Sequence, residues 1–194
     1  MIKINALGKP CPIPVIETKK AIRKLDGKAD TIEVTVDNEV AINNIYKMTQ
    51  DLGIATQTAQ QADDHFTTTL QPTGKLKEDS SIKEDIVIMI GTQTYGKGDD
   101  KLGTMLMKSY LYSLTELDDL PTTLIFFNEG AFLTDKTSPV LEDLQTLQDK
   151  GVTILTCGTC VDFYEIKDTH EIGDITNMFS ISEIQMKADN VVTL

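Results

Sequence analysis

The apolar positions of residues 1–70 follow the pattern of a small domain that contains both helices and strands. Ile32, Val34 and Val36 alternate with polar residues, which predicts a strand with one buried face. Elsewhere the apolar positions repeat every three or four residues, as in helices that lie on a sheet. The order β-α-β-α-β-β predicts a two-layer sandwich of helices on one mixed sheet. The elements are expected at residues 1–6, 12–25, 31–36, 38–52, 54–58 and 65–70.

Residues 85–194 have a different pattern, because continuous apolar strands alternate there with helices. Strands buried on both faces are typical of a parallel sheet covered by helices, so we predict a three-layer α/β/α domain with a mostly parallel sheet. Strands are expected at residues 85–90, 122–127, 152–156 and 190–193, and helices at 102–117, 140–150, 161–167 and 175–187. The first of these helices groups six side chains on one side, namely Leu102, Met105, Leu106, Ser109, Tyr112 and Ser113.

Residues 71–84 are polar and charged, and are predicted to link the two domains. Most of the net charge of −12 lies in residues 85–194. An acidic chain without tryptophan is a poor match for nucleic acid, whose binding depends on neutralising phosphates. No apolar run approaches the length of a membrane helix and no signal-peptide core is seen, so a cytoplasmic location without membrane contact is expected.

Cys11 lies between two prolines, directly before the first predicted helix, and Pro14 follows in its first turn. Proline is tolerated at the start of a helix, so Cys11 and Pro12 are expected at the helix entrance. A sulfur there would face free backbone N–H groups and the positive end of the helix dipole, which favour the reactive thiolate. Lys9 adds positive charge nearby. The alternative is an inert, buried cysteine.

Cys157 and Cys160 form a C-x-x-C pair at the end of the third predicted strand of the second domain. Active sites of parallel sheets lie beyond the carboxyl ends of the strands, so residues 91–100, 128–136 and 157–164 are expected to converge. We favour a reactive thiol there over a tight turn of two small residues and over a zinc site that would need two further ligands. A thioredoxin-type redox pair is also disfavoured, because the pair follows the third strand and no proline lies downstream of Pro139. The sequence leaves open which cysteine is reactive.

Residues 91–98 approach the pattern of a phosphate-binding loop, but Gly98 stands where Ser or Thr would bind Mg²⁺. Asp99 follows, and an acidic residue there suits the start of a helix better than a phosphate. Gly96 and Gly98 are therefore expected to form a close-approach loop beside the site. Asn128 follows the second strand and either forms a polar turn or lines the pocket. No cofactor and no metal is predicted.

The motif around Cys11, together with the β-α-β-α-β-β order, resembles the TusA/SirA/YedF family of sulfur carriers. Residues 85–194 resemble DsrE-like domains. Residues 96–103, 157–160 and 173–178 are together similar to a subgroup of two-domain YedF-like, sulfurtransferase-like proteins linked to selenium metabolism. The resemblance implies that Cys11 carries a persulfide and that Cys157 or Cys160 is the DsrE-type cysteine. It also implies homo-oligomers formed through the DsrE-like domain.

These features predict a carrier that relays sulfur or selenium as a persulfide or its selenium analogue, rather than an enzyme with classical turnover. The expected partners are a protein sulfur donor, such as a cysteine desulfurase, and a protein acceptor. The alternative is a non-catalytic binding or regulatory module whose thiols sense redox state or hold a metal. Four basic side chains on the first helix either dock an acidic partner or complement the helix dipole. These are Lys19, Lys20, Arg23 and Lys24.

Overall fold

The chain divides into two compact units, Met1–Ser80 and Ser81–Leu194. The computed structural model describes residues 1–10, 12–26, 28–62, 65–72 and 84–194. Cys11 lies outside the described residues, and so does most of the predicted linker at 71–84.

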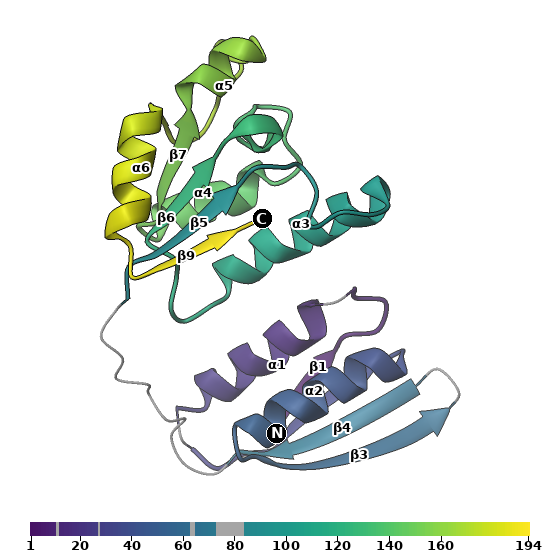
Figure 1. The fold of residues 1–194 in the computed structure, drawn as a ribbon. Helices are drawn as coiled ribbons and strands as arrows, with labels where there is room; N and C mark the ends of the chain where they lie inside the picture. The colour runs from purple at the N-terminus through teal and green to yellow at the C-terminus, as the bar shows by residue number, and fades with distance from the viewer. Residues whose placement is uncertain (11, 27, 63–64, 73–83) are drawn as a thin grey trace. The chain divides into compact units, whose positions relative to one another are not determined.

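The N-terminal unit has two layers, with both helices on one face of a four-stranded sheet (Figure 1). The strand order is β1-β2-β4-β3; β1 runs parallel to β2, and the other neighbours are antiparallel. This arrangement confirms the predicted mixed sheet and element order. The elements are β1 (Ile2–Asn5), α1 (Ile13–Lys24), β2 (Ile32–Val36), α2 (Glu39–Asp51), β3 (Ala55–Ala62) and β4 (His65–Gln71).

The core of this unit follows the predicted periodicity. Ile32, Val34 and Val36 are fully buried on the face of β2 that the helices cover. Helix α2 begins after Asn38, whose side-chain oxygen accepts a hydrogen bond from the backbone N–H of Ala41 at 2.8 Å. This cap satisfies one of the N–H groups that a helix start leaves without a partner, which explains the helix boundary.

The C-terminal unit is built on a five-stranded sheet in the order β8-β7-β6-β5-β9. All four strand pairs are parallel, which confirms the predicted sheet type and makes it fully rather than mostly parallel. The elements are β5 (Ile86–Ile90), α3 (Asp100–Thr115), β6 (Thr123–Phe126), the 3₁₀ helix η1 (Asn128–Thr134), α4 (Leu141–Asp149), β7 (Thr153–Cys157), α5 (Gly158–Phe163), β8 (Asp174–Thr176), α6 (Met178–Lys187) and β9 (Asn190–Thr193).

Helices cover both faces of this sheet, and side chains alternate between the two resulting cores. On β5, Ile88 and Ile90 face the core that includes Leu111 of α3 and Leu144 of α4. Val87 and Met89 face a second core with Ile181 of α6. Successive side chains of a strand point to opposite faces, so a continuous apolar strand is the expected sequence of a sheet covered on both sides.

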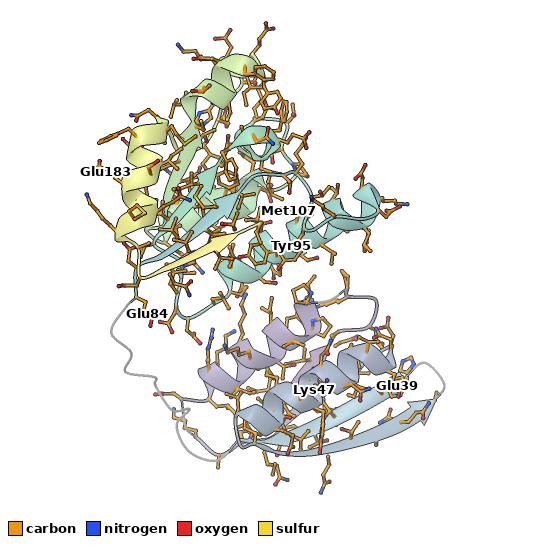
Figure 2. All side chains as sticks on the ribbon, viewed as in Figure 1. Glu39, Lys47, Glu84, Tyr95, Met107 and Glu183 are labelled. Atoms are coloured by element: carbon orange, nitrogen blue, oxygen red, sulfur yellow. The ribbon has the colours of Figure 1, made fainter. Side chains whose placement is uncertain are left out.

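Helix α3 buries a different side from the one that the sequence groups together. Its buried residues include Leu111, Leu114 and Met107, and Figure 2 labels Met107 on this helix. Leu102 and Met105, on the predicted side, are exposed by 53% and 60%. The helix carries apolar residues on both sides, so periodicity alone could not choose between them.

Candidate functional site

The carboxyl ends of β5, β6 and β7 bring three segments of the chain together. The backbone N–H of Asn128, after β6, donates to the Sγ of Cys160 at 3.1 Å. Gly130 packs on the end of β5, where an added Cβ would lie 2.1 Å from the carbonyl oxygen of Ile90. Only a residue without a side chain permits this approach. The segments after β6 and β7 therefore meet at Cys160, as predicted, and the segment after β6 also packs on the end of β5.

The two cysteines of the C-x-x-C pair differ in exposure. Cys157 is the last residue of β7 and the N-cap of α5, and only 1% of its surface is exposed. Its side chain belongs to the core between the sheet and α6. Cys160 lies one helical turn further on, is partly exposed, and packs against the same core. Both are free thiols, and Cys160 is the one that a partner can reach.

The environment of Cys160 sets its protonation. Burial raises the pKa of the Cys160 thiol above its ordinary value, and the neighbouring Cys157 raises it further. The N–H of Asn128 opposes this rise in pKa, because a donated hydrogen bond favours the thiolate. The thiol is therefore mostly protonated at neutral pH, and the Asn128 N–H is the group that stabilises a negative charge on its sulfur.

Asn128 has a backbone φ of +48°, in the left-handed region. Asparagine tolerates this region better than most residues with a side chain. Its side-chain oxygen also accepts a hydrogen bond from the hydroxyl of Tyr164 at 2.9 Å. The predicted polar turn is therefore present, and it aims the backbone N–H at the Cys160 sulfur.

Tyr164 was not identified from the sequence. It follows Cys160 by four residues, and this spacing places two residues on one side of a helical turn. Its ring packs against that of Phe132 from η1, with the ring centroids 4.7 Å apart. The ring contact and the hydrogen bond to Asn128 fix η1 against α5, and so hold the donor in place beside the sulfur.

Gly96, Gly98 and Asp99 shape the start of α3. Asp99 is the N-cap of this helix and accepts a hydrogen bond from the N–H of Leu102 at 2.9 Å. This role agrees with the expectation that an acidic residue here serves the helix. Gly96 and Gly98 have positive φ and are exposed. The hydrogen bond to Cys160 comes from η1 instead, and Cys160 also packs against a small apolar cluster that includes Ala131 of η1 and Val161 of α5.

Gly8 and Lys9, which precede Cys11, both contact other parts of the N-terminal unit. The N–H of Gly8, whose φ is +71°, donates to the Asp37 carboxylate at 2.6 Å. This bond lowers the pKa of Asp37, and the side chain of Asn38 lowers it further. Lys9 forms an ion pair with Glu17 of α1, with Nζ and Oε1 2.5 Å apart. The charge that was expected to act on Cys11 is therefore shared with a carboxylate.

The first turn of α1 differs from the expectation of free N–H groups. Pro12 is the N-cap and Pro14 lies within the first turn, and neither has an N–H to donate. The N–H of Ile13 donates to the carbonyl of Pro10, and those of Val15 and Ile16 donate to the carbonyl of Pro12. In the described part of this turn every N–H has a backbone acceptor, so that expectation was wrong.

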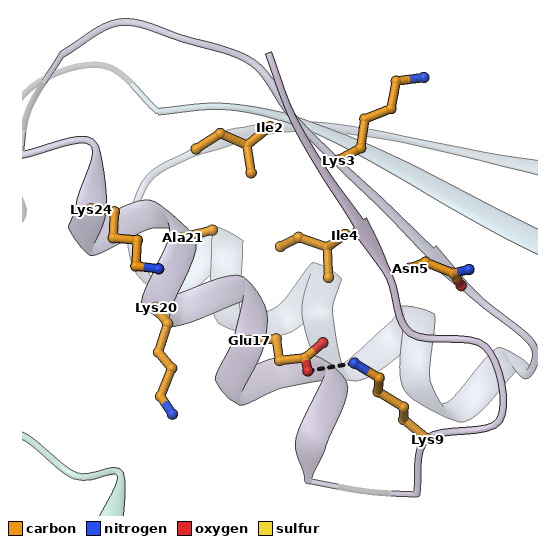
Figure 3. Close-up of a pocket in the computed structure, with 9 residues that line it drawn as sticks. All are labelled: Ile2, Lys3, Ile4, Asn5, Lys9, Glu17, Lys20, Ala21 and Lys24. Atoms are coloured by element: carbon orange, nitrogen blue, oxygen red, sulfur yellow. Dashed lines mark hydrogen bonds and ion pairs between the residues drawn. The ribbon is translucent and has the colours of Figure 1, made fainter.

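A groove of about 370 Å³ lies between α1 and β1, which is an edge strand of the sheet (Figure 3). Ile2 and Ile4 point from β1 toward α1 and form its apolar floor with Ala21. Its lysines are Lys3, Lys9, Lys20 and Lys24, of which two belong to the basic set predicted on the first helix. The groove thus combines an apolar floor, a strand that lies at the sheet edge among the described strands, and a border of lysines and Glu17.

The described residues contain neither a metal-binding cluster nor a membrane-spanning helix. No group of three or more His, Cys, Asp or Glu side chains among them is arranged to hold a metal ion. None of the helices within these ranges is both long and apolar enough to cross a membrane.

Two family models match this chain, and the boundary between the two structural units falls between the matched ranges. Residues 2–71 match the family model "Sulfurtransferase TusA". Residues 84–194, more than half of the chain, match the "DsrE/DsrF-like family". Both resemblances drawn from the sequence motifs are thereby confirmed.

Three individual proteins are similar to parts of this chain. The "Putative sulfur carrier protein" of Methanocaldococcus jannaschii is 32% identical over 66 residues, which are 34% of this chain and 87% of that protein. A SirA-like protein of Desulfitobacterium hafniense, with a known crystal structure, is 34% identical and matches 38% of this chain and 99% of its own (TM-score 0.37). The ychN protein of E. coli is 17% identical and matches 57% of this chain and 99% of its own (TM-score 0.46).

Proposed function

Because this chain belongs to the TusA sulfurtransferase family in residues 2–71 and to the DsrE/DsrF-like family in residues 84–194, we propose that it carries sulfur as a persulfide on Cys11 and passes it to a second thiol at Cys160. The observation that carries the proposal is the match of the Cys11 segment to a sulfur-carrier family. Membership of that family implies exchange with sulfur donors and acceptors.

The chemistry needs no oxidant or reductant. The Cys11 thiolate attacks the terminal sulfur of a donor persulfide, the donor cysteine leaves as a thiolate, and Cys11 then holds the extra sulfur. A second thiolate can attack the terminal sulfur of this new persulfide and release Cys11 as a thiolate again. Each step exchanges one S–S bond for another, as in thiol–disulfide exchange. A selenium atom would be carried through the same attack by thiolate.

Cys160 is the better candidate for the second thiol. A sulfur that exchanges with a partner must be reachable, and Cys160 is partly exposed whereas Cys157 is buried. The N–H of Asn128 points at the Cys160 sulfur and would stabilise the negative charge that forms on it during transfer. The C-x-x-C pair therefore has one accessible member with a built-in hydrogen-bond donor.

The groove beside α1 supports docking of an acidic segment of the donor or acceptor. Lys20 and Lys24 attract negative charge, and the apolar floor beside the edge strand β1 suits an extended segment. The double substitution Lys20→Glu/Lys24→Glu is expected to slow sulfur loading by a protein donor, more strongly at low salt. Lys47→Glu, an exposed charge on α2, is the matched control and is expected to leave the loading rate unchanged.

The decisive test is mass spectrometry after incubation with a cysteine desulfurase and cysteine. We expect the mass of one added sulfur atom on the Cys11 peptide and its loss in Cys11→Ser. In a chain with Cys157→Ala, a second adduct should appear on the Cys160 peptide only when Cys11 is intact. The absence of any sulfur adduct on Cys11 would overturn the proposal. Stoichiometric zinc together with unreactive thiols would identify a binding module instead. A parallel experiment with a selenide donor shows whether selenium is carried as well.

A further inference from the structure

The C-x-x-C pair places a second thiol directly behind the one that a partner can reach. Cys157 and Cys160 are three residues apart at the start of α5, a spacing that makes side chains of a helix neighbours. Both side chains contact the same core, which consists mainly of residues from β5, β6 and α6. Their separation along the chain is compatible with a disulfide closed across one helical turn.

The two sulfurs differ in how accessible they are, so they can have different roles. Cys160 is partly exposed and receives the Asn128 N–H, whereas Cys157 is enclosed behind it with 1% of its surface exposed. An incoming sulfur donor meets Cys160 first, and only a group already bound to Cys160 comes within reach of Cys157. A buried thiol in this position can act on its neighbour but not on a partner protein.

We propose that Cys157 resolves a persulfide on Cys160, so that the C-terminal unit releases sulfide instead of only storing sulfur. This inference rests on the proposed function for the identity of the cargo. The Cys157 sulfur attacks the inner Sγ of Cys160–S–SH. The bond from Sγ to the outer sulfur breaks, and the outer sulfur leaves as hydrosulfide, which takes up the Cys157 proton as H₂S.

The product is a Cys157–Cys160 disulfide, and the electrons balance within the step. The two cysteine sulfurs are oxidised to the disulfide, while the outer sulfur is reduced to sulfide. A dithiol reductant in solution would restore the pair in two exchanges. One of its thiols attacks the exposed Cys160 sulfur with Cys157 as the leaving thiolate, and its second thiol then forms the reductant's own disulfide and releases Cys160 as a thiolate. A selenium atom bound at Cys160 would leave as hydrogen selenide by the same attack.

The position of the Asn128 N–H agrees with this step. The donor lies at the Sγ of Cys160, the atom that Cys157 attacks and that the reductant attacks later. The attack is intramolecular and the two thiols are neighbours, so it should be much faster than release to a thiol in dilute solution.

The test loads the site chemically, independently of any relay. The full chain with Cys11→Ser is treated anaerobically with sodium tetrasulfide and desalted, and released sulfide and intact mass are followed. We expect one equivalent of sulfide and a product two hydrogen atoms lighter than the dithiol. With Cys11→Ser/Cys157→Ala, the extra sulfur should stay on the Cys160 peptide, with release slowed at least about 10-fold. With Cys11→Ser/Cys160→Ser, no sulfur should be taken up.

Two results would overturn the inference. One is a persulfide on Cys160 that lasts as long with Cys157 present as with Cys157→Ala. The other is sulfur uptake by Cys157 in the Cys160→Ser chain as fast as uptake by Cys160 in the Cys157→Ala chain. Cys157→Ser provides a second variant at this buried position, and thermal unfolding of each chain checks that the fold is kept. Failure of the proposed function appears separately, as the absence of Cys11 loading by the desulfurase in the chain with all cysteines intact.

Discussion

The backbone N–H of Asn128 lies 3.1 Å from the Sγ of Cys160, although the two residues are separated by 32 positions in the sequence. The donor exists because Asn128 adopts a φ of +48° at the first residue after Phe127. The Asn128 N–H can reach the Cys160 sulfur because β7 passes directly into α5, which places Cys160 in the first turn of that helix. This hydrogen bond therefore depends on the turn after β6 and on the start of the helix after β7, and these two strands are neighbours in the sheet.

Two substitutions of Asn128 separate the backbone donor from the side chain. Asn128→Gly keeps a residue that accepts positive φ, so the N–H should still reach Cys160 and its alkylation rate should change little. Asn128→Val disfavours this conformation by roughly 1–2 kcal/mol and should displace the donor. Loss of a hydrogen bond to the thiolate should then raise the pKa of Cys160 further and slow its alkylation by iodoacetamide about tenfold at neutral pH. Equal rates for the two variants would show that the donor does not act on the sulfur.

The buried side of α3 can be checked with two leucines of the same helix. Leu111 is fully buried, whereas Leu106, on the side grouped by the sequence, is 44% exposed. Leu111→Ala should lower the free energy of unfolding by about 2–5 kcal/mol, because it removes contacts and leaves a cavity. Leu106→Ala should change it by no more than about 0.5 kcal/mol. Urea unfolding followed by circular dichroism measures both, and the reverse ranking would contradict the orientation of α3.

The stability of the C-terminal unit should depend on His170. Burial lowers the pKa of His170, outweighing the nearby acidic groups Asp174, Asp135 and Glu171, which act to raise it. Its Nε2 lies 3.1 Å from the Oγ1 of Thr156. Because the unfolded chain binds this proton more tightly, the stabilising effect of the neutral ring is lost as pH falls below the ordinary histidine value of about 6.5 and through the lowered pKa.

We therefore expect the free energy of unfolding to fall with decreasing pH in this range, by at most about 1.4 kcal/mol per pH unit from this group. His170→Gln should remove that part of the pH dependence. His65→Gln provides the control, because His65 is the other histidine of the chain and lies exposed on β4. Urea unfolding at several pH values tests both variants, and an unchanged slope in His170→Gln would contradict the prediction.

The bond between Asp37 and Gly8 should stabilise the N-terminal unit only while Asp37 is ionised. The pKa of Asp37 is lowered, so its contribution is present above the ordinary carboxyl range and is lost as pH falls through the lowered value. Asp37→Asn should lower the melting temperature at pH 7, and the difference should disappear in acid. Asp26→Asn, which removes another exposed carboxyl of this unit, should have little effect at either pH. Faster hydrogen exchange at Gly8 in Asp37→Asn would report the lost bond directly.

Much of the fold follows from residues that act locally. The alternation of Ile32, Val34 and Val36 identified β2 because a strand has only two faces. The continuous apolar run of β5 indicated a sheet covered on both sides, as the two cores confirm. The side of α3 could not be identified in this way. Its sequence offers two apolar sides, and the choice depends on which one fits the sheet.

The functional features also divide into those that local sequence determines and those that tertiary packing determines. The sequence by itself determined the two units, the parallel sheet and the position of two cysteines at the end of β7. These features depend on periodicity and motifs, which involve residues close together in the chain. Only the tertiary structure decided that Cys160 is reachable while Cys157 is buried, and that the N–H of Asn128 meets Cys160. Exposure and long-range hydrogen bonds depend on contacts between segments that are distant in the sequence. The residues of one segment do not specify which other segment will lie beside it at the end of the sheet.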